Sequence, residues 1–330
     1  MIIIVAEIRV VLKMCVLSYI CSSSCCDDFD DDTKWCFVET CVALYFPLFV
    51  THSNVHAPHK RTTSSTSKMT PESDKKGQQE HVVVAQYQDL LAKLSPDEAF
   101  FEMANSPIVS FRIDSSSTVS ADVIRVEQKQ ELENSCGGIV WESAFALAEY
   151  LRKRVLKNQK QKTVIRDCID IGAGTGFLGI WIHKTIPNME RTVVTDTIEC
   201  FDLMQRNVER NFSNDNDDSS SKTIDVKPLD WTSKKDLDAL ATTGRGKFDL
   251  LVATDVIFAE RLVEPLIRCL KTLIDPEKGV CYVCAQPRDK LAFELFQELS
   301  AKEFSQFRKV PEEELDFSFD AECKLFEMRL

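Results

Sequence analysis

The chain has 330 residues, which is enough for one large α/β domain with extensions or for two small domains. Its composition, with 28% charged and 44% hydrophobic residues, is that of an ordinary globular protein. The formal net charge of −12 argues against nucleic acid as the main partner, because phosphate binding needs a basic stripe, and it suits a basic partner such as a lysine-bearing protein segment.

Residues 1–80 lack the pattern of a folded domain. The apolar run 1–20 is interrupted by Glu7, Arg9 and Lys13, so it is a poor signal peptide and too charged to span a bilayer. A second apolar run, residues 36–50, is too short to span. Residues 51–80 are rich in Ser, Thr, Lys, His and Pro, which predicts a disordered linker. We therefore expect residues 1–80 to be a poorly ordered extension, followed by a folded domain over residues 81–330.

The cysteine pattern indicates a reducing compartment and no metal site. Six of the 13 cysteines fall within the first 41 residues, and the others are scattered through expected strands and helices. Cys281 and Cys284 form a CxxC inside an apolar run. In a strand this spacing directs the two side chains to opposite faces, so we expect both thiols to be buried and structural.

Ordered structure is expected to begin near Val82. Helical apolar spacing covers Tyr87–Leu94, and short strands are expected at Phe111–Ile113 and Val123–Val126. Residues 139–156 have the spacing of an amphipathic helix. A buried strand is expected next, from Val164 to Ile169.

Residues 170–176 (DIGAGTG) are the most informative part of the chain. They connect this strand to a second apolar run, residues 177–182, which predicts the first turns of a helix. Such a turn presents bare backbone N–H groups at the positive end of a helix dipole. Gly172 and Gly174 allow positive φ and let a ligand touch the backbone, and Asp170 adds a carboxylate beside the opening. The turn therefore predicts a site for an adenosine-type cofactor, the alternative being a tight turn without ligand.

Two cofactors fit these residues. Residues 174–179 also spell the dinucleotide pattern GxGxxG, and Asp196, which ends a second short strand, lies about 20 residues on and can accept both ribose hydroxyls. The glycines alone leave NAD(P) and S-adenosylmethionine open. The acidic residue two positions before the first glycine favours S-adenosylmethionine, whose cationic end needs a negative charge nearby.

The remaining chain continues the alternation of strands and helices. Helices are expected at Glu199–Asn211, Asp236–Ala241, Glu260–Leu273 and Leu291–Leu299, with a polar loop at Ser213–Lys222. Strands are expected at Ile224–Val226, Phe248–Val252 and Val280–Val283, and a terminal antiparallel pair at Phe304–Val310 and Cys323–Leu330. This order predicts an α/β fold with a parallel sheet covered by helices on both faces. The closing hairpin is typical of Rossmann-like methyltransferases rather than dehydrogenases.

Several motifs in order resemble one family. They are residues 138–144 (GIVWESA), the glycine turn, residues 194–196 with Asn207–Val208 downstream, residues 229–231 (LDW) and residues 248–258 (FDLLVATDVIF). Over residues 120–330 the chain is similar to the seven-β-strand protein lysine methyltransferases of the methyltransferase-like 21 group (methyltransferase family 16). The resemblance implies a seven-stranded, Rossmann-like, S-adenosylmethionine-dependent enzyme that methylates a protein lysine. Within residues 81–330 it implies a lead-in at 81–136 and a cofactor-binding core at 137–330.

The resemblance also implies roles for particular residues. Trp141 matches a tryptophan that closes over the cofactor, Trp231 an aromatic that packs on the adenine, and Asp255 the start of a D-x-x-Y motif that ends here in Phe258. Phe258 keeps the aromatic wall but loses the hydroxyl. The expected cofactor-binding residues are Trp141, Asp170, Gly172, Ala173, Gly174, Asp196, Trp231 and Thr254, and the expected catalytic residues are Asp255 and Phe258. Core packing for Trp141 and loop fixing for Asp255 are the competing structural roles.

The relatives modify chaperones, an AAA ATPase, elongation factors and calmodulin, so the expected partner is a protein substrate such as a chaperone, an ATPase or a translation factor. We expect a monomer in the cytoplasm, with the nucleus as an alternative, and neither nucleic acid nor membrane as a partner. A methyltransferase acting on a small molecule or another side chain is the next hypothesis. An NAD(P)-binding oxidoreductase is a weaker hypothesis, since that function explains neither the tryptophans nor the segment that resembles D-x-x-Y. A catalytically inactive binding module is argued against by the intact Asp170, Asp196 and Asp255.

Overall fold

The fold was obtained as a computed structural model. It describes residues 84–86, 89–90, 92–113, 123–132, 135–156, 164–212, 222–242, 247–315 and 322–330. All of them belong to the same compact unit. The expectations for residues 1–80 and for the loop at 213–221 lie outside the described residues. The same is true of Tyr87, Gln88 and Leu91, which belong to the helix expected at Tyr87–Leu94.

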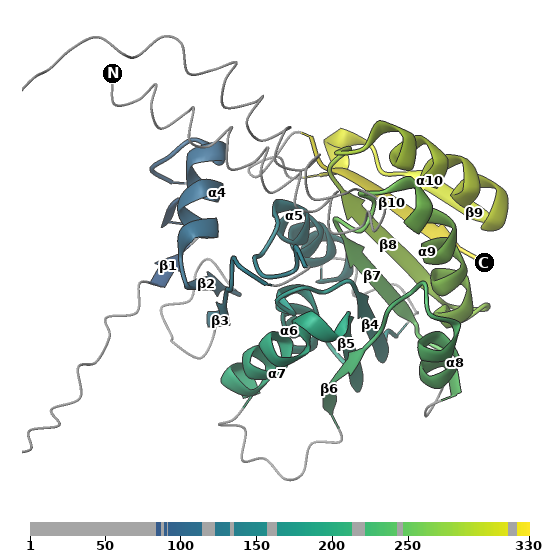
Figure 1. Cartoon of the computed structure of the whole chain (residues 1–330), viewed down its shortest axis with the longest axis horizontal. Helices are drawn as coiled ribbons and strands as arrows, with labels where there is room; N and C mark the ends of the chain where they lie inside the picture. The colour runs from purple at the N-terminus through teal and green to yellow at the C-terminus, as the bar shows by residue number, and fades with distance from the viewer. Residues whose placement is uncertain are drawn as a thin grey trace, which may run out of the picture. The chain divides into compact units, whose positions relative to one another are not determined.

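A seven-stranded sheet organises the fold, with strand order β6-β5-β4-β7-β8-β10-β9. Its strands are β4 (Asp167–Ile171), β5 (Arg191–Asp196), β6 (Thr223–Pro228), β7 (Leu250–Thr254), β8 (Val280–Ala285), β9 (Gln306–Lys309) and β10 (Lys324–Arg329). The pairs from β6 to β8 are parallel, whereas β10 runs antiparallel to both β8 and β9. The predicted Rossmann-like sheet with a closing antiparallel hairpin is confirmed (Figure 1).

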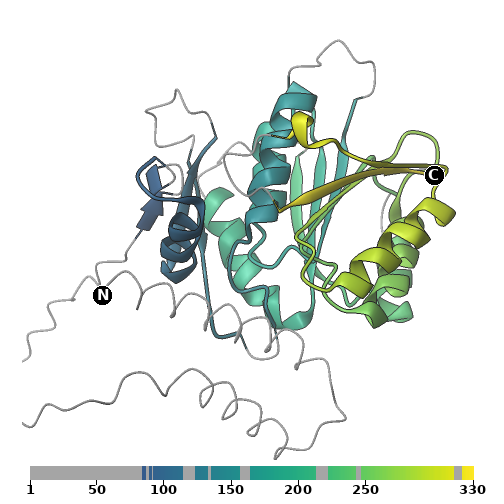
Figure 2. The same ribbon diagram turned by 90° about the horizontal axis from the view of Figure 1, so that it is seen from above.

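Helices cover both faces of this sheet, as expected from the alternation of elements (Figures 1 and 2). One face carries α5 (Glu142–Leu151), α6 (Phe177–Thr185) and α7 (Ile198–Phe212). The other carries α8 (Lys234–Thr242), α9 (Glu260–Leu273) and α10 (Lys290–Glu303). In α9, Val263, Leu266, Ile267 and Leu270 recur at helical spacing, which turns one continuous apolar stripe toward the sheet.

Alternation along the central strands divides the core in two. Successive residues of a strand point to opposite faces, so Cys281 joins the core under α8–α10 and Cys284 joins the core under α5–α7. Both thiols are buried, and neither is in a disulfide. The predicted burial of the two thiols on opposite faces of the sheet is confirmed.

A smaller sheet precedes the large one. It contains β1 (Val84–Gln86), β2 (Ile108–Arg112) and β3 (Val123–Glu127), with β1 parallel and β3 antiparallel to β2. Helix α4 (Pro96–Asn105) lies between β1 and β2 in the chain and was not predicted. Ser95 caps α4, because its hydroxyl accepts from the Glu98 N–H while the Glu98 carboxylate accepts from the Ser95 N–H at 3.0 Å.

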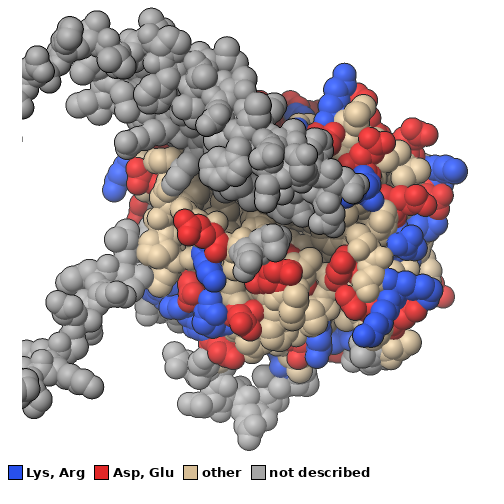
Figure 3. All heavy atoms as spheres, viewed as in Figure 1, with Lys and Arg blue, Asp and Glu red and all other residues tan. Residues whose placement is uncertain are grey.

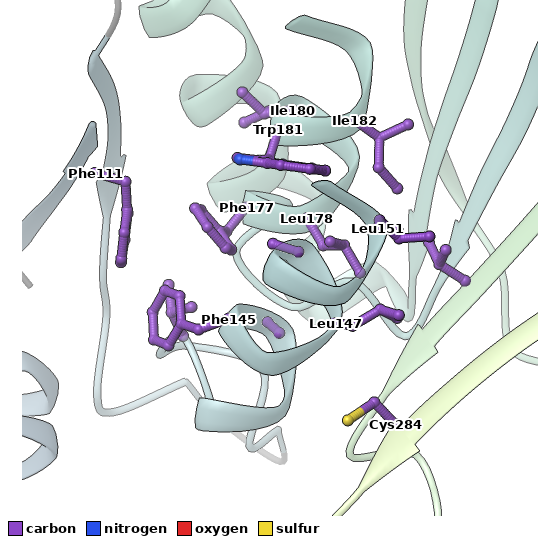
Figure 4. Packing of buried hydrophobic residues seen from close by; sticks show 14 of the residues in the cluster. Phe111, Phe145, Leu147, Leu151, Phe177, Leu178, Ile180, Trp181, Ile182 and Cys284 are labelled. Atoms are coloured by element: carbon purple, nitrogen blue, oxygen red, sulfur yellow. The ribbon is translucent and has the colours of Figure 1, made fainter. Parts of the chain in front are cut away.

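Three phenylalanines join the small sheet to helices α5 and α6 (Figure 4). The ring of Phe111 on β2 lies 4.4 Å from that of Phe145 on α5 and 4.5 Å from that of Phe177 on α6. The Phe145 and Phe177 rings are 5.0 Å apart, so the three side chains form one tilted cluster. Residues of the lead-in therefore share a hydrophobic core with α5 and α6.

Two asparagines of α7 complete the free edge of β3. Asn207 accepts from the Glu127 N–H at 2.7 Å and donates to the Glu127 carbonyl at 3.0 Å. Asn211, one turn on, makes the same pair of bonds with Arg125, at 3.1 and 2.7 Å. The asparagine amides thus take the place of a neighbouring strand. Asn207 also donates to the Thr175 carbonyl at 2.9 Å, which ties this edge to the glycine turn.

Several element boundaries differ from those predicted, and two of the differences have a local cause. The helix expected at 139–156 begins only at Glu142 and ends as α-helix at Leu151, where a π-helical turn (Arg152–Leu156) follows. Its start is displaced because the Val140 N–H donates to Gln128 Oε1 at 2.8 Å and the Gly138 carbonyl accepts from the Lys129 N–H at 2.7 Å, which keeps these residues out of the helix.

The strand expected from Val164 starts at Asp167. The ladder with β5 begins at the pair Asp167 and Arg191, while the Arg166 N–H donates to the Asp249 carboxylate at 2.8 Å. Val164 lies outside the sheet and is 45% exposed.

The strand order reverses between β4 and β7, so the carboxyl ends of these strands and their neighbours bound the place where open α/β sheets bind ligands. Among the helices that the structure describes, none is long and apolar enough to cross a membrane.

Candidate functional site

The glycine turn joins β4 to α6 at this point of reversal. Gly172, Gly174 and Gly176 have φ angles of 67°, 56° and 80°, which L side chains rarely adopt. The turn therefore needs glycine for its backbone conformation. Gly172 and Ala173 are partly exposed, whereas Gly174 is buried.

Close packing adds a second requirement at two of these positions. A Cβ on Gly172 would lie 2.6 Å from Val256 Cγ1 and 3.2 Å from the Trp231 ring. A Cβ on Gly174 would lie 2.7 Å from the Gly137 carbonyl oxygen. The turn is thus packed between Trp231 and Val256 on the one hand and the Gly137 backbone on the other.

Asp196 ends β5 and holds the turn. Its Oδ2 accepts from the Gly174 N–H at 2.8 Å, and its Oδ1 accepts from the Thr197 N–H at 2.7 Å. Burial raises the pKa of Asp196, and these hydrogen bonds from Gly174 and Thr197 oppose the rise. A carboxylate oxygen has more than one acceptor direction, so each oxygen can also accept a ligand hydroxyl.

Asp170 lies behind the turn rather than at its open edge. Its side chain is fully buried, and Oδ2 accepts from the Gly179 N–H in α6 at 2.8 Å. Burial raises the pKa of Asp170 to about 7, the Gly179 hydrogen bond lowers it, and the nearby Asp196 raises it. The expected carboxylate is therefore present, but it meets a ligand only through the turn.

Two buried polar atoms near the turn have no hydrogen-bond partner among the described residues. They are Asp170 Oδ1 and Trp231 Nε1. Buried polar atoms are normally paired, and unpaired ones in a native protein indicate a missing partner. Trp231 lies against Gly172, so its unpaired indole N–H and its ring fit a ligand with a hydrogen-bond acceptor and a flat ring, such as an adenosine-type cofactor.

Ile198 was missed by the sequence analysis. It opens α7 two residues after Asp196 and is 65% exposed, although most large apolar residues of the described chain are buried. An exposed isoleucine at the start of the helix that follows Asp196 is available for contact with a ligand held by that carboxylate. Its position two residues after Asp196 is the feature that sequence reasoning had available.

A second group of side chains gathers at the ends of β7 and β8. Asp255 follows Thr254, the half-buried last residue of β7, and has a φ of 52°, which is strained for a residue other than glycine. Its Oδ1 accepts from the Gln286 N–H at 3.0 Å and its Oδ2 from Ser143 Oγ at 2.9 Å. The guanidinium of Arg288 lies 3.5 Å from Oδ2.

Trp141 belongs to this second group. The Arg288 Cζ atom lies 4.5 Å from the centroid of the Trp141 ring, and Phe100 of α4 stacks on the same indole at 5.8 Å. The indole N–H donates to the Cys136 carbonyl at 3.2 Å. Because Gly137 packs on the glycine turn, the segment from Gly137 to Trp141 runs from the cofactor side of the site to Asp255.

The structure thus brings most of the predicted residues into two neighbouring groups. Gly172, Ala173, Gly174, Asp196 and Trp231 surround the turn, whereas Trp141, Thr254 and Asp255 stand at the ends of α5 and β7. Phe258 is partly buried against the core under α8–α10. Sequence reasoning missed Arg288 and the role of Ser143, because their contacts with Asp255 span 33 and 112 positions of the chain.

The sequence comparisons with known proteins agree on one family. A family model described as lysine methyltransferase matches residues 120–302. The chain is 26% identical over 155 residues to the protein-lysine N-methyltransferase EFM6 of Saccharomyces cerevisiae, covering 43% of this chain and 59% of that protein. It is 26% identical over 168 residues to the protein N-lysine methyltransferase METTL21A of Danio rerio, covering 50% and 69%. The protein-lysine methyltransferase METTL21E of Mus musculus is 29% identical over 140 residues, with 42% and 52% covered. The chain thus spans about half to two thirds of these relatives.

Solved structures that resemble the fold are more distant. The N-terminal domain of human METTL16 in complex with SAH has a TM-score of 0.40 at 15% identity and covers 58% of this chain and 71% of that chain. The O-methyltransferase from Bacillus cereus in complex with SAH has a TM-score of 0.39 at 16% identity and covers 57% and 80%.

Proposed function

We propose a function that proceeds from the family of the chain, which belongs to the lysine methyltransferases. In this proposal the protein transfers a methyl group from S-adenosylmethionine to a lysine side chain of another protein. The observation that carries this proposal is the glycine turn held by Asp196, next to a second carboxylate, Asp255, at the end of β7. The first arrangement suits an adenosine cofactor and the second suits an amine.

The cofactor would be held by the residues around the turn. In the proposal, the backbone of Gly172, Ala173 and Gly174 lies against the cofactor, and Asp196 accepts from its ribose hydroxyls. Trp231 lies beside the adenine, Asp170 acts from behind the turn, and Trp141 and Thr254 border the methionine end. The unpaired Trp231 Nε1 supports this assignment.

When bound, the cofactor supplies an activated sulfonium methyl group, so the protein's task is to position an amine that has lost its proton. A lysine with an ordinary pKa near 10.4 arrives charged, and a carboxylate attracts it and accepts its hydrogen bond. Asp255 is prepared for this task, because Ser143 and the Gln286 N–H fix its two oxygens. In this proposal Asp255 orients the amine, the proton leaves to water, and Phe258 borders the alkyl stem.

The substrate is proposed to be a protein, in line with the names of the relatives, and the family resemblance makes a chaperone, an ATPase or a translation factor the first candidates. On the face drawn in Figure 3, acidic and basic side chains of the described residues are interspersed, without a continuous basic stripe for phosphates. We further propose that residues 81–330 carry the activity as a monomer in the cytoplasm or nucleus, with a lead-in at 81–136 and the cofactor-binding core at 137–330.

The cofactor assignment is tested by calorimetry with S-adenosylhomocysteine and NADH. We expect the first to bind and the second not to. Replacing Asp196 by alanine removes a charged acceptor for two hydroxyls, so the affinity for S-adenosylhomocysteine should fall by about 10²-fold. Binding of NADH alone, or an unchanged affinity in the Asp196→Ala variant, contradicts the assignment.

The reaction is tested by transfer of a tritiated methyl group to proteins of a whole-cell lysate, followed by mass spectrometry of the labelled band. We expect label on lysine, loss of label with Asp255→Ala, and no change with Asp202→Ala, which removes an exposed carboxylate from α7. Label on a metabolite or on nucleic acid, or full activity of Asp255→Ala, refutes the proposal.

A further inference from the structure

We propose that Trp141, Ser143 and Asp255 form the subsite for the acceptor amine, and that Arg288 occupies this subsite until a lysine side chain displaces it. The identity of the ligand as a substrate lysine rests on the proposed function. The occupancy by Arg288 rests on the geometry of the second group of side chains.

Arg288 already makes the contacts that an incoming lysine needs. Its guanidinium lies over the Trp141 ring at 4.5 Å and beside Asp255 Oδ2 at 3.5 Å. An aromatic face and a carboxylate can each hold either a lysine or an arginine cation. The Asp255 side chain is only 6% exposed, and the Arg288 guanidinium lies beside its Oδ2, so a lysine that approaches this oxygen from the same side must displace Arg288.

Asp255 does not depend on Arg288 for its position. Its Oδ1 is fixed by the Gln286 N–H at 3.0 Å and its Oδ2 by Ser143 Oγ at 2.9 Å, both shorter than the contact with Arg288. Removal of Arg288 therefore leaves the carboxylate in place and frees one side of it. The acceptor subsite therefore keeps its geometry when a lysine cation replaces the Arg288 cation.

The contact of Arg288 with Asp255 is long. The two side chains are 3.5 Å apart, which exceeds the roughly 2.7–2.9 Å of a strong charge-assisted hydrogen bond, and the Arg288 side chain is 26% exposed. It stands just before α10, where the side chain of Asp289 caps the helix by accepting from the Ala292 N–H at 3.1 Å. The backbone is thus anchored one residue later, while the arginine side chain is partly exposed to solvent.

An arginine is suited to such a place because it remains charged at every ordinary pH. It neutralises Asp255 when no substrate is present and offers no amine that can lose its proton. If Arg288 stayed in place, its charge would repel an arriving lysine cation. Arg288 therefore competes with the substrate lysine for this subsite and lowers the affinity of the subsite for lysine.

The test uses the full chain saturated with S-adenosylhomocysteine and n-butylammonium as a probe for the lysine side chain, with its Kd measured by ligand-observed NMR. We expect Arg288→Ala to bind the probe about 10-fold tighter than the wild type, which corresponds to 1.4 kcal/mol. Arg288→Met should behave in the same way. Arg268→Ala, which removes an exposed arginine from α9, should bind like the wild type. Adding Asp255→Asn to Arg288→Ala should abolish the gain.

Equal or weaker binding of n-butylammonium by both Arg288 variants overturns the inference, provided that they bind S-adenosylhomocysteine like the wild type and so are folded. The proposed function fails separately if neither the wild type nor Arg288→Ala methylates any protein of the lysate. In that case, a roughly 10-fold lower Kd of Arg288→Ala for n-butylammonium still supports a cation-binding subsite at Asp255. Where a methylated protein is found, a lower KM with unchanged kcat in Arg288→Ala supports displacement. A lower kcat in Arg288→Ala, with a pH profile of kcat shifted to higher pH, shows instead that Arg288 stays beside Asp255 and acts on the lysine. This result overturns the inference.

Discussion

Replacing Asn207 by alanine is expected to lower both the stability of the protein and its affinity for the cofactor. Asn207 is completely buried on α7, and its amide makes three hydrogen bonds, two with the backbone of Glu127 and one with the Thr175 carbonyl in the glycine turn. Alanine fills none of these roles. The edge of β3 and the glycine turn would lose the same support at once.

The size of the effect follows from the burial of the partners. The bond to Thr175 is buried, so its carbonyl would be left without a partner at a cost of about 1–3 kcal/mol. The two Glu127 groups are partly buried, and water can replace the lost bonds at about 0.5–1 kcal/mol each. Together these terms predict a loss of about 3 kcal/mol in the free energy of unfolding.

Asn211 provides a matched control, because it makes the same two bonds to Arg125 one turn later at more exposed positions and does not touch the glycine turn. Asn211→Ala should lose only about 1 kcal/mol and should bind S-adenosylhomocysteine like the wild type. Urea denaturation measures the stabilities, and calorimetry measures the affinities. Equal stability losses in the two variants, or an unchanged cofactor affinity in Asn207→Ala, would refute the reasoning.

Three further predictions concern the turn, the pH dependence and the extension. In thermal unfolding, Gly174→Ala should be destabilised more than Gly176→Ala, because both have positive φ but only the Gly174 Cβ meets a backbone atom, at 2.7 Å; equal losses would speak against the packing argument. The pKa of Asp170 is about 7 in the folded protein against 3.8 as a model value, so the folded state keeps a proton that the unfolded chain has lost, and stability falls as pH rises between these values. Relative to Asp170→Asn, the wild type should lose about 3 kcal/mol between about pH 5 and about pH 8 in urea denaturation, and parallel pH profiles would contradict this. Removing residues 1–80 should leave a protein that binds S-adenosylhomocysteine with wild-type affinity, whereas aggregation or loss of binding would show that the extension belongs to the fold.

Elements whose periodicity reflects one large buried face were predictable from the sequence. Helix α9 was predicted with the bounds that the structure has, since its apolar residues repeat at helical spacing toward a single sheet. Helix α4 was missed, although Ser95 and Glu98 spell a capping box that marks its start. The start of α5 could not be predicted from residue spacing, because the side chain of Gln128 binds the Val140 N–H and keeps Val140 out of the helix.

The cofactor side of the site was more predictable than the acceptor side. Gly172, Gly174 and Asp196 lie on a local strand–turn–helix pattern whose backbone chemistry is written in consecutive residues. The burial of Asp170 under α6 depends on the contact with Gly179, which the pattern does not specify. The position of Arg288 over Trp141 depends on the packing of α5 against the end of β8, and no local pattern encodes it.

The place of β10 in the large sheet has a consequence for how the protein is made. β10 follows β8 and β9 in the chain but lies between them, so β9 has no ladder to join until β10 has been synthesised and inserted. Until then the edge of β8, an entirely apolar strand that is buried throughout in the finished sheet, stands unpaired. A nascent chain at this stage is a substrate for chaperones and a template for aggregation, because an open apolar edge accepts any extended segment. Substitutions that delay the arrival of β10 should therefore reduce the yield of folded protein before they change the activity of the molecules that fold.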